Sequence, residues 1–157
     1  MKKRRQGPAG KRPRQLKLDK AFTPLPVDDG DELFPNGIFE FNVTKMLAFI
    51  EANPDRFPVT NTEVEPLRGF SLEILNEETI QRADLSKPII LAEISPGRFN
   101  VIDGNHRVEK AGREGRETIP SLRIGAEQHL AFLTSVRAFE AYVKYWNSKI
   151  AEIDSPI

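Results

Sequence analysis

The stretch KPIILAEISPGRFNVIDGNHRVEKAGREGRETIPSLRI, residues 87–124, holds the clearest succession of structural signals in the chain. An apolar run over 89–94 ends at a Ser-Pro-Gly turn, and a second run over 98–102 follows it, which predicts a β-hairpin. A helical pattern over about 105–113 ends at Gly115, and a strand is predicted at 118–124. This alternation indicates a single compact α+β domain with a small mixed sheet.

Five residues stand where the second predicted strand gives way to the helix: Asp103, Gly104, Asn105, His106 and Arg107. A helix start presents unpaired backbone N–H groups and the positive end of the helix dipole. Gly104 lets a ligand approach the backbone closely, and the planar fork of Arg107 suits phosphate oxygens. Together these features predict an anion site, most economically a phosphate site.

Asp103 does not fit a pure phosphate site, because a carboxylate repels phosphate. Its presence is explained if it binds a magnesium ion or takes a proton from an attacking hydroxyl group. A simpler interpretation makes Asp103 a helix cap, Gly104 a turn residue, His106 a surface residue and Arg107 the partner of a glutamate. For an isolated D-G-x-H-R string the simpler interpretation comes first, and only the sequence around it favours a site.

Other elements are predicted from apolar spacing and capping residues. The best helix is NVTKMLAFIEAN at 42–53, where Val43, Met46, Leu47 and Ile50 share one face and Asn42 is the N-cap. Residues 21–37 contain three prolines and an acidic run, which predicts an irregular lead-in. Further predictions are strands at 38–41 and at 60–67 with Val64 facing inward, a helix over about 76–84 capped by Asn76, and one long helix from about 126 to 150.

The N-terminal residues form a basic arm. Residues 1–20 hold nine Lys or Arg and one acid, a net charge of +8, whereas the rest of the chain carries −8. With almost no large apolar groups the segment is predicted to be disordered. It is expected either to bind DNA or RNA phosphates or to act as a solubilising tail. Its candidate contacts are Lys2, Lys3, Arg4, Arg5, Lys11, Arg12 and Arg14.

Composition excludes several classes of function. The chain has no cysteine, so disulfides, cysteine-based zinc sites and thiol catalysis are ruled out, and a reducing cytoplasm is expected. No apolar run approaches the ~20 residues of a membrane span, and the basic start lacks the apolar segment of a signal peptide. His129 is expected to be a surface or core-edge residue, since no potential ligand is paired with it in sequence.

The run 87–124 and the residues before it, about 60–125 in all, resemble the ParB/sulfiredoxin superfamily. In that family a Pro-led strand, a hairpin return, a G-x-x-R-type motif, a helix and a strand starting near Ile-Pro follow one another. The corresponding features are Pro88, Gly104 to Arg107, and Ile119-Pro120. The D-G-x-H-R variant is most similar to the branch that includes free-serine kinases and ParB-like nuclease proteins.

The resemblance implies a motif loop that binds nucleotide phosphates through Gly104, Asn105, His106 and Arg107. Asp103 matches the acidic residue implicated in catalysis in the kinase branch, and His106 is the second catalytic candidate. That branch also uses a second glutamate, for which Glu63 and Glu65 are candidates by position alone. Sulfiredoxins carry a reactive cysteine where this chain has Asn105, so reduction of sulfinic acids is excluded. The helix-turn-helix domain of chromosome-partition ParB proteins is not expected here, because one long helix and a short segment after the motif domain are too little for it.

The resulting division is a disordered basic arm at 1–20, a lead-in with one helix at 21–58, and a ParB/sulfiredoxin-like domain with a long C-terminal helix at 59–157. The first functional hypothesis is a Mg²⁺-dependent phosphotransferase or nucleotide hydrolase (a kinase, ATPase or nuclease) that uses ATP, ADP or CTP, with Asp103 holding the metal. The alternative is a non-catalytic nucleotide- or DNA-binding module anchored by the arm. The aromatic residues of the last helix leave room for a homodimer through that helix.

Overall fold

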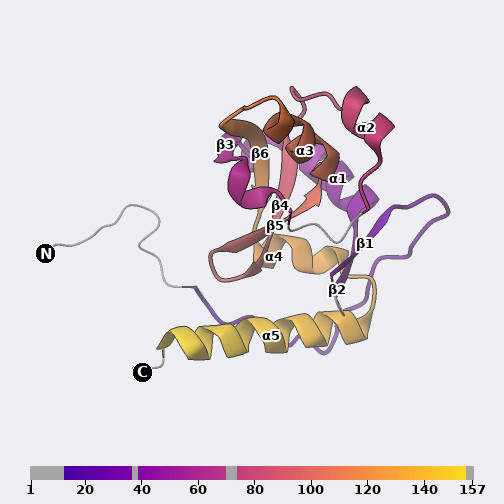
Figure 1. Cartoon of the computed structure of the whole chain (residues 1–157). Helices are drawn as coiled ribbons and strands as arrows, with labels where there is room; N and C mark the ends of the chain where they lie inside the picture. Colours follow the sequence, from indigo (N-terminus) through magenta and orange to yellow (C-terminus); the bar gives the residue numbers. More distant parts are fainter. Residues whose placement is uncertain (1–12, 37–38, 70–73, 155–157) are drawn as a thin grey trace, which may run out of the picture.

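The computed structural model describes residues 13–36, 39–69 and 74–154. These ranges form an α+β architecture with a mixed four-stranded sheet, a separate two-stranded sheet and a long C-terminal helix (Figure 1), which confirms the predicted fold class. Of the seven predicted arm contacts, only Arg14 lies in these ranges. The other six lie outside the described residues: Lys2, Lys3, Arg4, Arg5, Lys11 and Arg12.

The four-stranded sheet consists of β3 (Thr60–Glu63), β4 (Ile89–Ser95), β5 (Arg98–Asp103) and β6 (Thr118–Ile124), in the spatial order β3-β6-β4-β5. β4 runs antiparallel to β5 and parallel to β6. A parallel neighbour needs a crossover connection, and α3 (Asn105–Arg113) supplies it. The stretch 87–124 therefore forms three of the four strands and the helix that links them.

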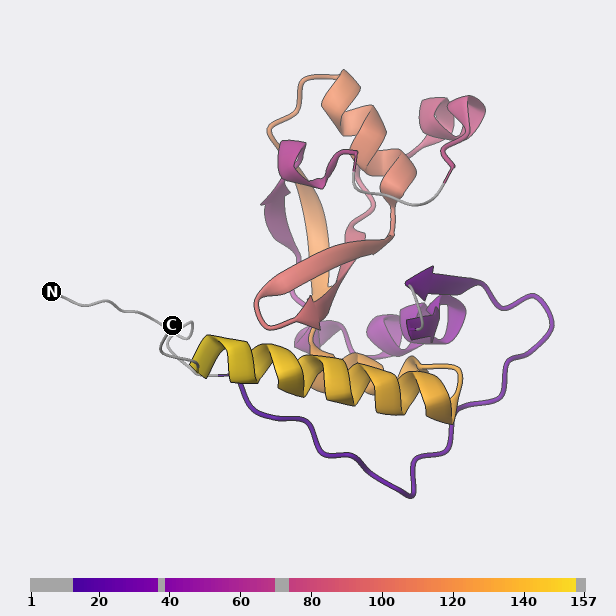
Figure 2. The ribbon, with the colours of Figure 1, turned by 60° about the horizontal axis from the view of Figure 1, so that its bottom comes forward.

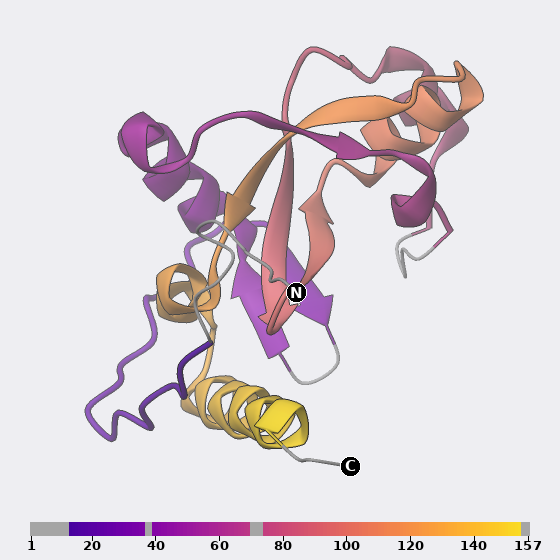
Figure 3. The ribbon, with the colours of Figure 1, turned by 90° about the vertical axis from the view of Figure 1, so that its left-hand side faces the viewer.

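Apolar side chains cover both faces of this sheet, because successive residues of a strand point to opposite sides. On one face, Ile89 and Leu91 of β4 pack with Val108 of α3. On the other face, Ile90 and Ala92 join a larger cluster with residues of α1, α4 and α5. Figures 1 and 3 show α2 and α3 on one side of the strands and α5 on the other.

The segment before the sheet forms a β-hairpin and a helix. β2 (Phe39–Asn42) leads directly into α1 (Val43–Ala52), and the Asn42 side chain accepts a hydrogen bond from the Lys45 N–H at 3.1 Å, which confirms the predicted N-cap. β1 (Leu33–Asn36) pairs antiparallel with β2. It lies in the segment expected to be irregular, so that expectation is wrong for these residues.

Two smaller elements follow the predictions with adjusted ends. α2 (Glu77–Arg82) begins at the predicted cap, since the Asn76 side chain accepts from the Thr79 N–H at 2.9 Å. β3 ends at Glu63 instead of continuing to residue 67, because a 3-10 turn that contains Pro66 follows at Glu65–Leu67. Val64 is fully buried between them, as its predicted inward direction requires.

The single helix predicted over about 126–150 is wrong. The chain forms α4 (Ala126–His129), a 3-10 turn (Leu130–Phe132) and then α5 (Val136–Asp154). Between them, the Thr134 N–H donates to the Glu40 carbonyl at 2.9 Å, and the Thr134 hydroxyl donates to the Glu40 carboxylate at 2.7 Å. The hydroxyl of Ser135 then caps α5 by accepting from a backbone N–H at 3.0 Å. A contact with a residue 94 positions away therefore breaks the helix.

Residues 13–22, which we call the N-terminal strap, run along α5 (Figure 2). The Leu16 N–H donates to the Asn147 side chain at 2.8 Å, and the Leu16 carbonyl accepts from the same amide at 3.0 Å. The indole N–H of Trp146 donates to the Arg14 carbonyl at 2.7 Å. Farther along, the Phe22 ring stacks on Phe139 with 4.1 Å between ring centroids.

The strap corrects one expectation. The prediction that residues 1–20 are a disordered arm is wrong for residues 13–20, because Leu16 is buried in the main core and its backbone is held on α5. Two leucines, Leu16 and Leu18, among polar and charged residues give little periodic signal, and the partner of Leu16 lies 131 positions away.

The aromatic face of α5 turns inward. Phe139, Tyr142 and Trp146 are buried, and Tyr145 packs beside Phe39 at 5.5 Å between ring centroids. The side chains that suggested a homodimer through this helix are therefore used within the chain. No helix in the described ranges combines the length and apolar composition needed to cross a membrane.

Candidate functional site

A cavity of about 750 Å³ lies where three separate segments of the chain meet. The segments are residues 32–35 at the start of β1, the end of α2 with the turn that follows it, and residues 102–107 between β5 and α3. All five junction residues line it: Asp103, Gly104, Asn105, His106 and Arg107. The structure thus brings the predicted site residues together in one cavity.

Gly104 adopts a conformation that only glycine takes readily. Its φ of 110° is left-handed, and an added Cβ would come within 2.5 Å of Ile89 Cγ2. Gly104 is the N-cap residue of α3, and the backbone N–H groups of the first turn receive no capping hydrogen bond from a side chain at this position. The glycine therefore lets the chain turn closely over β4, and it leaves the first turn of α3 beside the cavity.

Arg107 is tied to the backbone and to Asp103. One Nη donates to the Pro88 carbonyl at 2.6 Å and to the Lys87 carbonyl at 3.1 Å, and the other donates to the Asp103 carboxylate at 3.0 Å. These bonds use three of the five guanidinium N–H groups. Arg107 therefore orients Asp103 and fixes the start of β4 in addition to lining the cavity.

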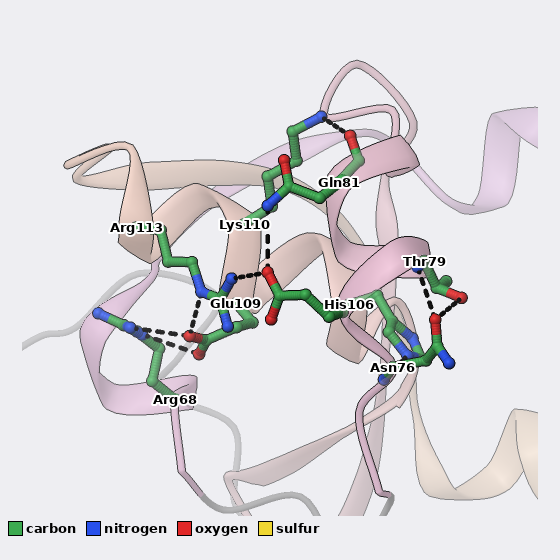
Figure 4. A network of polar contacts seen from close by, with 9 residues as sticks. Arg68, Asn76, Thr79, Gln81, His106, Glu109, Lys110 and Arg113 are labelled. Carbon is green, nitrogen blue, oxygen red and sulfur yellow. Dashed lines mark hydrogen bonds and ion pairs between the residues drawn. The ribbon is translucent and has the colours of Figure 1, made fainter.

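His106 links the cavity to α2. Its Nε2 accepts a hydrogen bond from the Asn76 N–H at 3.1 Å, just before α2 begins (Figure 4). This hydrogen bond holds the ring in a defined orientation beside the start of α2. Asn105, beside it, is buried in the first turn of α3.

The acidic residues near Asp103 differ from those expected. Glu63 and Glu65 do not line the cavity, and Glu65 pairs with Arg68 at 3.1 Å instead. Glu32 and Asp84 line it. Hydrogen bonds from the Ser86 side chain and backbone hold the pKa of Asp84 below its ordinary value.

Glu32 was not identified from the sequence. It ends the acidic run DDGDE, and a run of acids carries no spacing rule that singles out one member. Its backbone is fixed on α1, since its N–H donates to the Thr44 hydroxyl at 2.7 Å and its carbonyl accepts from the Val43 N–H at 2.9 Å. The position of the carboxylate at the cavity thus depends on the β1–β2 hairpin, which the sequence did not reveal.

Two cationic side chains besides Arg107 line the cavity, Lys87 and Arg82. Arg82 also pairs with Glu78 at 2.6 Å on the exposed side of α2. Lys110 and Arg113 do not line it. They bind α2 instead, through the Gln81 and Ala83 carbonyls and the Glu77 carboxylate.

Nothing among the described residues forms a preformed metal centre. No group of three or more His, Asp or Glu side chains there is arranged to hold a metal ion. Magnesium bound at Asp103 would accordingly take its other ligands from phosphate oxygens and water, which is the usual way proteins bind nucleotide-associated magnesium.

His129, expected at the surface or at the edge of the core, is fully buried. Its Nε2 lies 2.6 Å from the Glu93 carbonyl, and its ring packs edge-on against Phe41 and Tyr142. Burial lowers the pKa of His129 to about 4. The residue is part of the core and is neutral at pH 7.

One family model matches the part of the chain that contains the junction. Residues 56–132 match the family model of the ParB N-terminal domain. The matched segment runs from just before β3 to the turn after α4, and it contains α2, α3 and the whole junction. No curated protein shows a significant match to the chain. The D-G-x-H-R branch stays a prediction. Through residues 56–132 the chain belongs to the ParB/sulfiredoxin superfamily.

Proposed function

We propose that the cavity binds the phosphates of a nucleoside phosphate (ATP, ADP or CTP) together with Mg²⁺, and that the protein is a phosphotransferase or nucleotide hydrolase. Membership of the superfamily supports a ParB-like role in binding nucleotide or DNA. The observation that carries the finer proposal is the meeting of the α3 N-terminus with Asp103, Lys87 and Arg107 in one cavity. Backbone N–H groups and cations suit phosphate, and the carboxylate suits magnesium.

The other wall of the cavity supports a nucleoside as the remainder of the ligand. Leu33, Phe34, Pro35 and Ile102 line it with mostly apolar surface. An inorganic phosphate would leave that wall exposed to water, whereas the base and ribose of a nucleotide would cover it. An aromatic ring such as Phe34 also offers a stacking surface worth about 1–3 kcal/mol per base.

In this proposal the residues divide the work as follows. Gly104, Asn105 and His106 present the first turn of α3 to phosphate. Arg107 contacts phosphate with the N–H groups that its bonds to Asp103 and the β4 backbone do not use. Asp103 holds magnesium or accepts the proton of an attacking hydroxyl or water, with His106 beside it. The phosphoryl group then passes to that oxygen while the nucleoside diphosphate, or monophosphate, leaves.

The test is calorimetric titration of ATP, ADP and CTP with magnesium. The full chain should bind at least one of them below millimolar concentration. Phe34→Ala should weaken the nucleotide by about 1–3 kcal/mol, roughly five- to a hundredfold, and leave the affinity for pyrophosphate unchanged. Leu25→Ala, an exposed apolar side chain that does not line the cavity, is the matched control. Absence of binding by the unaltered protein at millimolar nucleotide would overturn the proposal.

A second candidate is a non-catalytic nucleotide- or DNA-binding module. Six lysines and arginines stand in residues 1–12 without an acid, and such runs bind nucleic-acid phosphates without sequence information. Phosphate release from ATP, ADP or CTP with magnesium separates the two candidates. Binding without any turnover supports the module, and turnover supports the enzyme.

A further inference from the structure

α3, which begins at the junction, also binds α2, and α2 with the turn after it forms one wall of the cavity. α2 has only six residues, and Ile80 is its buried residue. A helix of this length is not stable by itself, so its position must come from tertiary contacts. Thr79 and Arg82 of α2, with Ala83 and Asp84 after it, line the cavity.

Three side chains of α3 bind α2 along its length (Figure 4). His106 accepts from the Asn76 N–H ahead of the helix. Arg113 forms an ion pair with Glu77 in its first turn. Lys110 Nζ donates to the Gln81 carbonyl at 2.9 Å and to the Ala83 carbonyl at 2.8 Å at its C-terminal end. The spacing of 106, 110 and 113 places all three on one face of α3.

Of these three contacts, only that of Lys110 reaches a lining residue at the α2 end of the cavity, Ala83. The last carbonyls of a helix have no partner within the helix, and a lysine that binds two of them satisfies both and offsets the negative end of the dipole. Ala83, whose carbonyl Lys110 binds, is itself a lining residue, and Asp84 follows it. A shift of the Lys110 ammonium group would therefore move the wall directly.

We propose that Lys110 is a positioning residue of the nucleotide site, which sets the place of α2 relative to the N-terminus of α3 and so the width of the cavity. This inference rests on the proposed function of the same cavity. It assigns to Lys110 an effect on ligand affinity without any contact with the ligand.

The experiment compares Lys110→Gln, Lys110→Arg and Arg116→Gln in the full chain. Arg116 is a matched control, because it pairs with Glu114 and makes no bond to α2. In Lys110→Gln, hydrogen exchange of the amides in residues 77–83 should become at least tenfold faster. The affinity for whichever of ATP, ADP and CTP the unaltered chain binds best, measured with magnesium, should fall roughly tenfold. Lys110→Arg still donates to both carbonyls, so both values should return to near those of the unaltered chain.

The two readouts separate this inference from the proposed function. If the unaltered chain binds none of ATP, ADP and CTP, the proposed function fails, whatever exchange shows. If the unaltered chain binds one of them and Lys110→Gln binds it equally well, Lys110 does not set the site and the inference is overturned. Unchanged exchange in residues 77–83 would overturn it as well. Should Lys110→Gln fail to fold, the Lys110→Met variant, which keeps the apolar stem of the side chain but donates no hydrogen bond to the Gln81 and Ala83 carbonyls, gives the same two measurements.

Discussion

Asp103 is bonded in a way that makes its chemistry separable from its structural role. Its carboxylate accepts from Arg107 at 3.0 Å, and an asparagine oxygen in the same place could accept the same bond. Asparagine also resembles aspartate in shape but has neither basicity nor charge. The substitution Asp103→Asn therefore removes the proposed catalytic property and keeps the local hydrogen bond.

We expect Asp103→Asn to keep the fold and nucleotide binding and to lose at least ~100-fold of any phosphotransfer or hydrolysis. Phosphate release under saturating nucleotide measures the rate, and thermal unfolding measures the fold. If turnover equals that of the unaltered protein, Asp103 takes no proton and positions no metal, and the enzyme hypothesis loses its main support.

His129 should make the stability depend on pH. Its pKa is about 4 in the folded chain, where burial disfavours the charged ring, and about 6.5 in the unfolded chain. As pH falls from 6.5 to 4, the unfolded state takes up the proton first, so the folded state loses stability across that window. The loss approaches about 3 kcal/mol below pH 4.

Urea unfolding at several pH values between 7.5 and 4.5 measures this loss. The carboxyl groups of Asp31, Glu77 and Glu109 have lowered pKa values, because hydrogen bonds favour their charged forms, and they act at lower pH. The slope between pH 6.5 and 4.5 therefore belongs mainly to His129. The variant His129→Phe cannot take up a proton and should show a much flatter profile there. An equal slope in both proteins would contradict the assignment.

At the scale of elements, the turn from β5 into α3 depends on close packing over β4. Gly104→Ala adds left-handed strain and a Cβ at 2.5 Å from Ile89 Cγ2, so we expect a loss of about 3 kcal/mol in the free energy of unfolding. Gly97→Ala is the matched control, because Gly97 is also left-handed but has no atom within 4 Å of the added Cβ. It should lose only about 1 kcal/mol. Equal losses in the two variants would show that packing over β4 contributes nothing.

The elements that sequence predicts well are those whose signals are local. Asn42 and Asn76 were recognised as caps because the bonds they make lie three residues away in the chain. β1 was not recognised, because its strand character comes from pairing with β2 and Pro35 argues against a strand. The junction residues, which the local string predicts as a site, do line one cavity, although their function stays a prediction. Glu32 lines the same cavity but is not predicted, since the hairpin that carries Glu32 to the cavity is itself a tertiary arrangement.

At the scale of the whole molecule, the first twelve residues of the basic arm and the N-terminal strap (residues 13–22) can be tested separately by two deletions of different length. Removing residues 1–12 deletes six cations and leaves the contacts of Arg14 and Leu16 with α5. Removing residues 1–20 also deletes a buried leucine and three hydrogen bonds.

We expect the deletion of residues 1–12 to weaken duplex DNA binding and to reduce the log–log salt slope by about 0.9 for each lost phosphate contact, with no change in stability. The deletion of residues 1–20 should in addition lower the free energy of unfolding by about 3 kcal/mol or more, from the lost leucine burial and hydrogen bonds. Fluorescence anisotropy with a labelled duplex and urea unfolding give the two quantities. Identical DNA binding by the full chain and the shorter deletion would assign the arm another purpose.

The contact between Leu16 and Asn147 also has a consequence during synthesis on the ribosome. The two residues are 131 positions apart. At a translation rate of about 5–20 residues per second, Asn147 is therefore synthesised roughly 7–26 s after Leu16. During that interval the strap leaves the exit tunnel with apolar side chains and no helix to cover them. The sheet and α3 can assemble earlier, because their pairings lie within one continuous stretch. We therefore expect α5 to close under the strap after the sheet has assembled, and a nascent chain stalled before residue 147 should expose Leu16 and Phe22 to chaperones and proteases.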